Sequence, residues 1–291
     1  MYTAYYQLRE KPFVLTPDPR FLFLSLAHRE ALAHVIYGID QGEGFIAVTG
    51  EVGTGKTTLC RTVLERLGND AEVAFVFNPT LTGEELLRAV SMEYGLPEAC
   101  RTRAELNEQL NRFLLDARAA GRKVVLVVDE AQNLSMETLE EVRLLSNLET
   151  STSKLIQIVL FGQPELDEKL DSPGLRQLRQ RISVRWRLSP LSQAEAAEYV
   201  RHRVRIAAGG ARDLFSPSAL REIGRRARGV PRLLNLLADR SLLAGDVDHA
   251  PRVERAHVNQ AAREILSAGR RTRRVRRSGA FKTGRVVEDR A

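Results

Sequence analysis

The chain has 291 residues, of which 43% are hydrophobic and 28% charged, and it contains 20 glycines and 11 prolines. That composition is typical of a folded globular chain, and it excludes a mainly disordered protein, a collagen-like repeat and a small disulfide-stapled domain. The net charge is +7, from 44 Lys and Arg against 37 Asp and Glu, which is compatible with a polyanionic partner such as nucleic acid, anionic lipid or nucleotide phosphates.

From Glu43 onward, short apolar runs rich in Val, Ile, Leu and Phe alternate with longer helical patterns. This alternation predicts a doubly wound α/β domain, in which helices cover a parallel sheet whose strands are buried on both faces. The predicted strands are 45–49, 73–77, 123–129, 155–162 and 182–188. The predicted helices are 56–67, 83–94, 104–120, 136–149, with Ser135 as N-cap, and 164–170.

The strand signal stops after Leu188, and helical patterns follow at 193–208, 217–244, with a break near Gly229-Val230-Pro231, and 252–268. These patterns predict a smaller all-helical domain. The expected division is therefore an N-terminal linker (1–41), a P-loop α/β domain (42–190), a helical domain (191–268) and a basic tail (269–291) that we expect to be disordered.

The positive charge is concentrated toward the end of the chain. Residues 174–232 hold fourteen Lys and Arg against four acids, and residues 270–291 hold nine against two, which equals the whole net charge. The arginine-rich run 270–277 is a candidate contact for DNA or for an anionic membrane surface. The alternative interpretation is a solvated arginine face with a frayed end.

Two features favour a cytoplasmic protein. Cys60 and Cys100 lie far apart, without a CxxC spacing or clustered histidines, so neither a disulfide framework nor a zinc site is indicated. The longest uncharged apolar run is 155–164, much shorter than the ~18 residues of a membrane helix, so we expect neither a membrane span nor an export signal. Peripheral contact with the inner membrane is one interpretation of the basic tail.

The segment Gly50-Glu51-Val52-Gly53-Thr54-Gly55-Lys56-Thr57, followed by Thr58, matches G-x-x-x-x-G-K-[ST] between a predicted strand and a predicted helix. Its glycines permit a tight loop whose backbone N–H groups face phosphate oxygens, and the start of the helix adds its positive dipole. In such a loop Lys56 reaches the β- and γ-phosphates of ATP, and Thr57 coordinates Mg²⁺. The alternative is a glycine-rich structural turn.

The predicted strand 123–129 ends in Asp129 and is followed by Glu130. Asp129 is placed to hold the hydration shell of Mg²⁺, and Glu130 is placed to polarise the water that attacks the γ-phosphate. This pair of carboxylates indicates an ATPase with its own base rather than a slow P-loop switch. The alternative is a solvent-exposed strand end that happens to carry two acids.

Three further polar side chains are candidates for the same reaction. Gln163 ends the fourth predicted strand, where it either orients water as a polar sensor or belongs to a turn. Arg181, or its neighbour Arg179, precedes the fifth strand, from where it is placed to project toward a nucleotide in a neighbouring subunit. Arg232 opens a helix of the same chain and is placed to reach the γ-phosphate from there.

Further blocks of sequence surround these motifs. They are Tyr5-Tyr6-Gln7-Leu8, Thr16-Pro17-Asp18-Pro19-Arg20-Phe21, Asp129-Glu130-Ala131-Gln132, Gly162-Gln163-Pro164-Glu165-Leu166, Gln180-Arg181-Ile182 and Gly229-Val230-Pro231-Arg232-Leu233-Leu234-Asn235. With the P-loop, they make the chain resemble bacterial AAA+ ATPases of the general secretion pathway protein A type, also called ExeA-like. The resemblance covers residues 2–267 and the ATPase part only, without the membrane helix and peptidoglycan-binding module of the secretion relatives.

This resemblance implies a sheet domain and a helical lid with ATP between them, and an N-terminal segment near 16–27 that flanks the adenine. It also implies oligomers, because the arginine finger of one subunit serves its neighbour. The site residues that it implies are Lys56 and Thr57 (Walker A), Asp129 and Glu130 (Walker B), Gln163 (sensor 1), Arg232 (sensor 2) and Arg181 (arginine finger).

The expected function is an oligomeric, Mg²⁺-dependent ATPase whose cycle of ATP binding and hydrolysis assembles or remodels a protein partner in secretion or envelope assembly. The main alternative is an ATP-dependent DNA-binding adaptor of the transposition-helper type. A small-molecule kinase on the same P-loop is disfavoured, because Asp129-Glu130 and the helical lid suit hydrolysis better than phosphoryl transfer to a metabolite.

Overall fold

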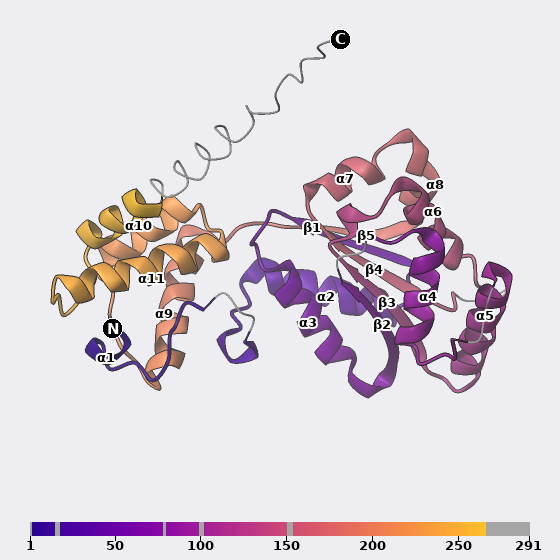
Figure 1. Ribbon diagram of the computed structural model, residues 1–291, viewed down its shortest axis with the longest axis horizontal. Helices are drawn as coiled ribbons and strands as arrows, with labels where there is room; N and C mark the ends of the chain where they lie inside the picture. The colour runs from indigo at the N-terminus through magenta and orange to yellow at the C-terminus, as the bar shows by residue number, and fades with distance from the viewer. Residues whose placement is uncertain (1, 15–17, 78–79, 99–101, 150–153, 266–291) are drawn as a thin grey trace, which may run out of the picture. The chain divides into compact units, whose positions relative to one another are not determined.

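Five apolar runs of the sequence form one parallel sheet in the computed structural model, which describes residues 2–14, 18–77, 80–98, 102–149 and 154–265 (Figure 1). The strands are β1 (Phe45–Gly50), β2 (Ala71–Phe77), β3 (Lys123–Asp129), β4 (Gln157–Gly162) and β5 (Ile182–Leu188), in the order β2-β3-β4-β1-β5. All four neighbouring pairs are parallel. The carboxyl ends of all five strands therefore lie at one edge of the sheet.

The chain divides into two units, which we call the sheet unit, Leu22–Leu191, and the helical unit, Met1–Phe21 with Ser192–Ala291. The predicted N-terminal linker, 1–41, is shared between them. The predicted basic tail, 269–291, lies outside the described residues. No helix in the described part of the chain is long and apolar enough to cross a membrane.

Helices cover both faces of the sheet, as the near-continuous apolar strands predict. Along β1, Ile46 and Val48 pack on α2 (Leu26–Asp40) and α3 (Lys56–Leu67), whereas Phe45 and Ala47 belong to the core on the other face. That second core is closed by α4 (Gly83–Glu93), α5 (Arg103–Ala119), α6 (Met136–Leu145), α7 (Pro164–Leu170) and α8 (Arg176–Arg181). Figure 1 shows α2 and α3 on one side of the sheet and α4, α5 and α6 on the other.

The doubly wound α/β prediction is confirmed, and several elements have the predicted bounds, among them α3, α7, β3 and β5. Ser135 caps α6 as predicted, since its hydroxyl oxygen accepts a hydrogen bond from the Thr138 N–H at 3.1 Å. The predicted end of α6 at 149 is wrong, because the helix ends at Leu145 and the Ser146 N–H turns back to Arg143. Helix α2 was not predicted, although the buried residues Ala31, Leu32, Val35 and Ile39 follow helical spacing.

The helical unit contains α9 (Gln193–Ala208), α10 (Pro217–Ala227), α11 (Pro231–Val247) and a further helical stretch at 255–265. The predicted break in the second helical pattern is confirmed. Arg228 and Gly229 both adopt positive φ, 50° and 71°, and Pro231 then starts α11. Left-handed residues end a helix, and proline at the first turn begins one without losing a hydrogen bond.

The N-terminal segment packs within this same unit, with α1 (Tyr2–Tyr5) next to α11. The Tyr2 hydroxyl donates to Asp239 at 2.5 Å. Arg203 of α9 is 7% exposed. Its guanidinium donates to the carbonyls of Pro12 (2.5 Å) and Val14 (3.1 Å) and lies 4.8 Å from the centre of the Phe21 ring. Arg203 therefore fixes the N-terminal segment to the helical unit.

Replacing Arg203 by Met should loosen this segment. The aliphatic part is kept, but the carbonyls of Pro12 and Val14 lose their donor, which should lower the unfolding free energy of the unit by roughly 2–4 kcal/mol. Thermal unfolding and limited proteolysis of the N-terminus measure the effect. Arg201→Met on the same helix is the control, because half-buried Arg201 forms an ion pair with exposed Glu198, a contact worth about 0.5 kcal/mol. Equal losses in the two variants would contradict the anchoring role.

Candidate functional site

The loop between β1 and α3 has the backbone that phosphate binding requires. Gly53 and Gly55 adopt φ of 81° and 101°, a region that side-chain-bearing residues rarely enter. A Cβ atom at Gly55 would also lie 2.8 Å from Nε2 of His28. Gly55 is the N-cap of α3 and offers no capping side chain. The first N–H groups of α3 are thus open to an anion.

Lys56 lies at the start of α3 with its ammonium group folded into this loop. The residue is 5% exposed, and Nζ donates to the carbonyls of Gly50 (2.8 Å) and Glu51 (3.0 Å). Burial lowers the pKa of Lys56, and the nearby carboxylates of Glu130 and Asp129 partly oppose that shift. A buried cation held beside the loop backbone is suited to the negative charge of a triphosphate.

Thr57 and Asp129 meet below the loop. Thr57 Oγ1 donates to Asp129 Oδ2 at 2.9 Å, and the Glu130 N–H donates to Asp129 Oδ1 at 2.9 Å. Asp129 is fully buried, and this burial raises its pKa, against the lowering effect of those two hydrogen bonds. A hydroxyl and a carboxylate are oxygen ligands of the kind that Mg²⁺ takes, so the residues fit this metal.

Glu130 is held by two glutamines. Its backbone is left-handed, with φ 56° and ψ 36°, which is uncommon for a residue other than glycine. Its Oε2 atom accepts hydrogen bonds from Gln132 Nε2 (2.6 Å) and Gln163 Nε2 (3.0 Å), while the Gln163 N–H donates to Gln132 Oε1 (3.0 Å). The three side chains meet because β3 and β4 are neighbours and end at the same edge.

The structure therefore brings together Lys56, Thr57, Asp129, Glu130 and Gln163. In the rest of the loop, Glu51 and Val52 are exposed, Thr58 is half-buried, and Thr54 is buried with its hydroxyl donating to the Glu51 carbonyl at 2.8 Å.

The two predicted arginines come from other elements, α8 and α11. Arg181 ends α8 and donates to the Ser146 hydroxyl at 2.7 Å, whereas Arg179 is exposed. Arg232 is an exposed residue in the first turn of α11, in the helical unit.

The sequence analysis assigned no role to His28. In the structure, its side chain contacts the backbone of the P-loop. The ring is 4% exposed, with Nε2 3.0 Å from the Thr54 carbonyl and Nδ1 2.6 Å from Ser25 Oγ. Because a carbonyl only accepts, Nε2 carries the proton and Nδ1 accepts from the serine hydroxyl. No spacing rule in the sequence connects a residue of α2 with a loop that begins more than twenty positions later.

A second contact that was not predicted lies at the start of the P-loop, between Thr49 and Asp167. Thr49, which directly precedes Gly50, donates through Oγ1 to Asp167 Oδ2 at 2.6 Å. The other carboxylate oxygen of Asp167 accepts from Arg185 Nε at 2.9 Å. Because α7 starts directly after Gln163, this chain of bonds joins the P-loop strand, the helix that follows Gln163 and strand β5.

The sequence is similar to a known domain family and to two named proteins. Residues 39–170 match the family described as AAA domain. Over 288 residues, 99% of this chain, the sequence is 43% identical to general secretion pathway protein A of Aeromonas hydrophila, and it spans 51%, about half, of that protein's length. A segment of 120 residues, 41% of this chain and 35% of the relative, is 31% identical to ATP-dependent target DNA activator B of Escherichia phage Mu.

Among solved structures, the ORC2 protein of Aeropyrum pernix is similar in fold. The similarity covers 88% of this chain and 71% of the other, with a TM-score of 0.64 and 18% sequence identity. The AAA domain match, the shared fold and the long alignment to the secretion protein agree with one another. Residues 39–170 therefore carry an AAA domain in a P-loop fold, and the chain is similar over nearly its whole length to general secretion pathway protein A.

Proposed function

We propose that the chain is an oligomeric, Mg²⁺-dependent ATP hydrolase that uses its ATPase cycle to assemble or remodel a protein partner. The observation that carries this proposal is the contact of Thr57 with Asp129 beneath the P-loop, with Glu130 beside them. A threonine hydroxyl, a buried carboxylate and a second carboxylate at one edge of a parallel sheet are the parts that ATP hydrolysis requires.

In this proposal the P-loop N–H groups and the Lys56 ammonium bind the phosphates, and Thr57 and Asp129 hold Mg²⁺. The metal, when bound, neutralises charge that develops on the phosphate oxygens. The carboxylate of Glu130 orients a water and accepts its proton as the water oxygen attacks the γ-phosphorus and the bond to ADP breaks. Gln163 and Gln132 position that carboxylate through the hydrogen bonds described above.

A relative supports the proposed kind of partner. The long similarity to a general secretion pathway protein supports a partner in secretion or envelope assembly. Since ATP is the substrate, we place the protein in the cytoplasm. The basic run 270–277, which lies outside the described residues, is then the candidate contact with an anionic membrane surface.

A second candidate function rests on the 31% identity to a phage protein named as a target DNA activator. In this function ATP controls assembly on DNA, and the basic run 270–277 contacts the DNA phosphates.

Steady-state ATP hydrolysis, measured across protein concentrations with and without double-stranded DNA, separates the two candidate functions. A rate per subunit that rises with concentration and ignores DNA supports the assembly ATPase. Strong stimulation by DNA supports the adaptor, and no hydrolysis under any condition contradicts the first proposal.

Mixing two inactive variants tests whether Arg181 acts on the neighbouring subunit. Arg181→Ala should lower kcat by about 10³, because an arginine finger stabilises charge in the transition state. Adding the Glu130→Gln variant should restore part of the activity, since each subunit supplies what the other lacks. Arg179→Ala is the control and should hydrolyse normally. No recovery in the mixture, or the loss appearing in Arg179→Ala instead, would contradict the role of Arg181.

Gln163→Leu should slow turnover without weakening ATP binding. The substitution removes one of the two amide donors that hold Glu130, so kcat should fall about tenfold, which corresponds to ~1.4 kcal/mol. ATP affinity should stay within about twofold, because the phosphate-binding groups are unchanged. Gln41→Leu is the control, because Gln41 follows α2 at the opposite edge of the sheet. Equal kcat in the two variants would remove Gln163 from the mechanism.

A further inference from the structure

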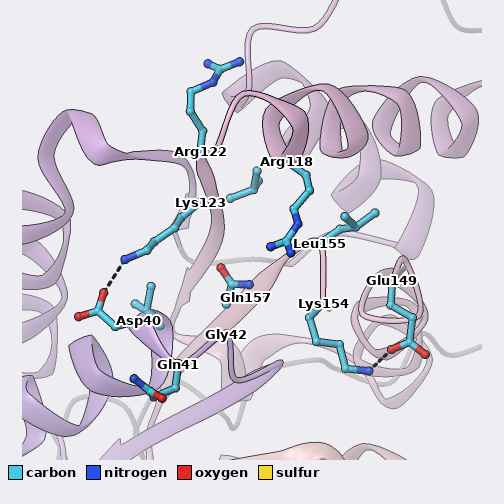
Figure 2. A pocket seen from close by; sticks show the side chains of 13 residues that line it. Asp40, Gln41, Gly42, Arg118, Arg122, Lys123, Glu149, Lys154, Leu155 and Gln157 are labelled. Atoms are coloured by element: carbon cyan, nitrogen blue, oxygen red, sulfur yellow. Dashed lines mark hydrogen bonds and ion pairs between the residues drawn. The ribbon is translucent and has the colours of Figure 1, made fainter. Parts of the chain in front are cut away.

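A pocket lies at the opposite edge of the sheet, where β1, β3 and β4 begin (Figure 2). Its volume is about 820 Å³, within the range of small-molecule sites. The lining comes from the end of α2 and the turn after it (39–42), the end of α5 and the start of β3 (118–124), Glu149, and the segment that leads into β4 (154–157). The P-loop and Asp129 are at the carboxyl ends of β1 and β3, so this pocket is separate from the candidate nucleotide site.

Most charges around the pocket are already paired. Lys123 Nζ lies 2.6 Å from Asp40, Lys154 pairs with Glu149, and the guanidinium of Arg122 pairs with Glu72. Arg118 differs, because it forms no ion pair with any residue in the described ranges. Figure 2 shows Arg118 extending from the end of α5 into the pocket, whereas Arg122 extends away from it.

Gln157 supplies an unsatisfied acceptor at the same place. The residue is 6% exposed, and its Oε1 atom is buried without a hydrogen-bond partner among the described residues. A buried acceptor without a donor costs about 1–3 kcal/mol, and such groups are rare in native proteins. Gln157 lines the pocket (Figure 2), and once its amide turns toward the pocket, a bound molecule with an O–H or N–H group would satisfy Oε1.

The net charge of the lining indicates the kind of molecule. Arg122 extends away and is paired with Glu72, so three bases, Arg118, Lys123 and Lys154, face two acids, Asp40 and Glu149, which leaves an excess of one positive charge. A phosphate monoester carries about −1.5 to −2 at neutral pH, and a guanidinium fork binds phosphate oxygens in pairs. We propose that this pocket binds a small phosphate monoester that also carries hydroxyl groups, with its phosphate on Arg118 and a hydroxyl donating to Gln157.

This inference does not rest on the proposed ATPase activity, and its test is direct binding to the full chain. Glycerol 3-phosphate is the probe, inorganic phosphate tests the anion alone, and glycerol tests the hydroxyls alone. Calorimetric titration should show saturable binding of glycerol 3-phosphate, weaker binding of phosphate and none of glycerol. Absence of saturable binding of glycerol 3-phosphate would overturn the proposal and leave an ordered water as the partner of Gln157.

Variants place the binding in this pocket. Arg118→Gln should weaken glycerol 3-phosphate binding at least about tenfold, because the bidentate phosphate contact is lost. Arg122→Gln, the same change of charge four residues along the chain, should alter it less than about twofold, since Arg122 extends away from the pocket and pairs with Glu72. Equal weakening by the two variants would overturn the proposal.

Two further variants test whether the ligand binds at the P-loop instead and whether Gln157 contacts it. Lys56→Ala should leave the affinity for glycerol 3-phosphate unchanged, and loss of binding there would assign the anion to the P-loop instead and overturn the proposal. Gln157→Leu should weaken glycerol 3-phosphate binding about threefold to tenfold, the effect of one lost hydrogen bond, and should leave inorganic phosphate binding unchanged. An equal effect on both ligands would remove Gln157 from the site.

Discussion

Replacing Lys56 by Ala should weaken ATP binding at least about 100-fold, which corresponds to ~2.8 kcal/mol. The reason is its position, since the buried ammonium group lies against the carbonyls of Gly50 and Glu51 at the start of α3. A cation there, screened from water, interacts strongly with the β- and γ-phosphates. Titration with a fluorescent ATP analogue measures the loss.

The control for this experiment is Lys123→Ala. Lys123 belongs to the same sheet unit, but its ammonium group pairs with Asp40 at the opposite edge of the sheet. This variant should bind ATP with unchanged affinity. If Lys56→Ala bound ATP as tightly as Lys123→Ala, the loop would be a structural turn, and the nucleotide site would have to lie elsewhere.

Replacing Glu130 by Gln should stop turnover and leave ATP binding intact. We expect kcat to fall by about 10²–10⁴, the usual contribution of a general base. The substitution keeps the shape of the site, because an amide oxygen can accept the same two hydrogen bonds from Gln132 and Gln163 that Oε2 of Glu130 accepts now. What it removes is the negative charge that receives the proton of the attacking water.

Single-turnover hydrolysis and ATP titration together test this prediction. Glu137→Gln, an exposed carboxylate at the start of α6, is the matched control and should hydrolyse ATP normally. Normal hydrolysis by Glu130→Gln would refute its assignment as the base, and Asp129 would be the next carboxylate to test. Loss of ATP binding in Glu130→Gln would show instead that the residue supports the site rather than the reaction.

The loop, its lysine and the two carboxylates could be predicted because each depends on neighbours in sequence. A P-loop is a continuous segment in which glycines allow the backbone and the following helix supplies the N–H groups. Strand β3 is likewise a local pattern, an apolar run that ends in Asp129, and the structure gives it the predicted bounds. The alternation of apolar runs and helical patterns was sufficient for the fold class for the same reason.

Contacts between segments far apart in the sequence could not be predicted from such local patterns. Helix α2 places His28 under Thr54, and the order of the strands brings Gln163 next to Glu130 and Thr49 next to Asp167. The sequence allows many strand orders, and each would bring a different set of strand ends together.

The sequence by itself determined the P-loop and the strand that ends in the two carboxylates, because both are properties of short continuous segments. Only the tertiary structure decided which side chains hydrogen-bond to Glu130, what supports the P-loop and that Arg118 and Gln157 line one pocket. Those features depend on which strand ends are neighbours in the sheet, and that order follows from the packing of two cores on its faces.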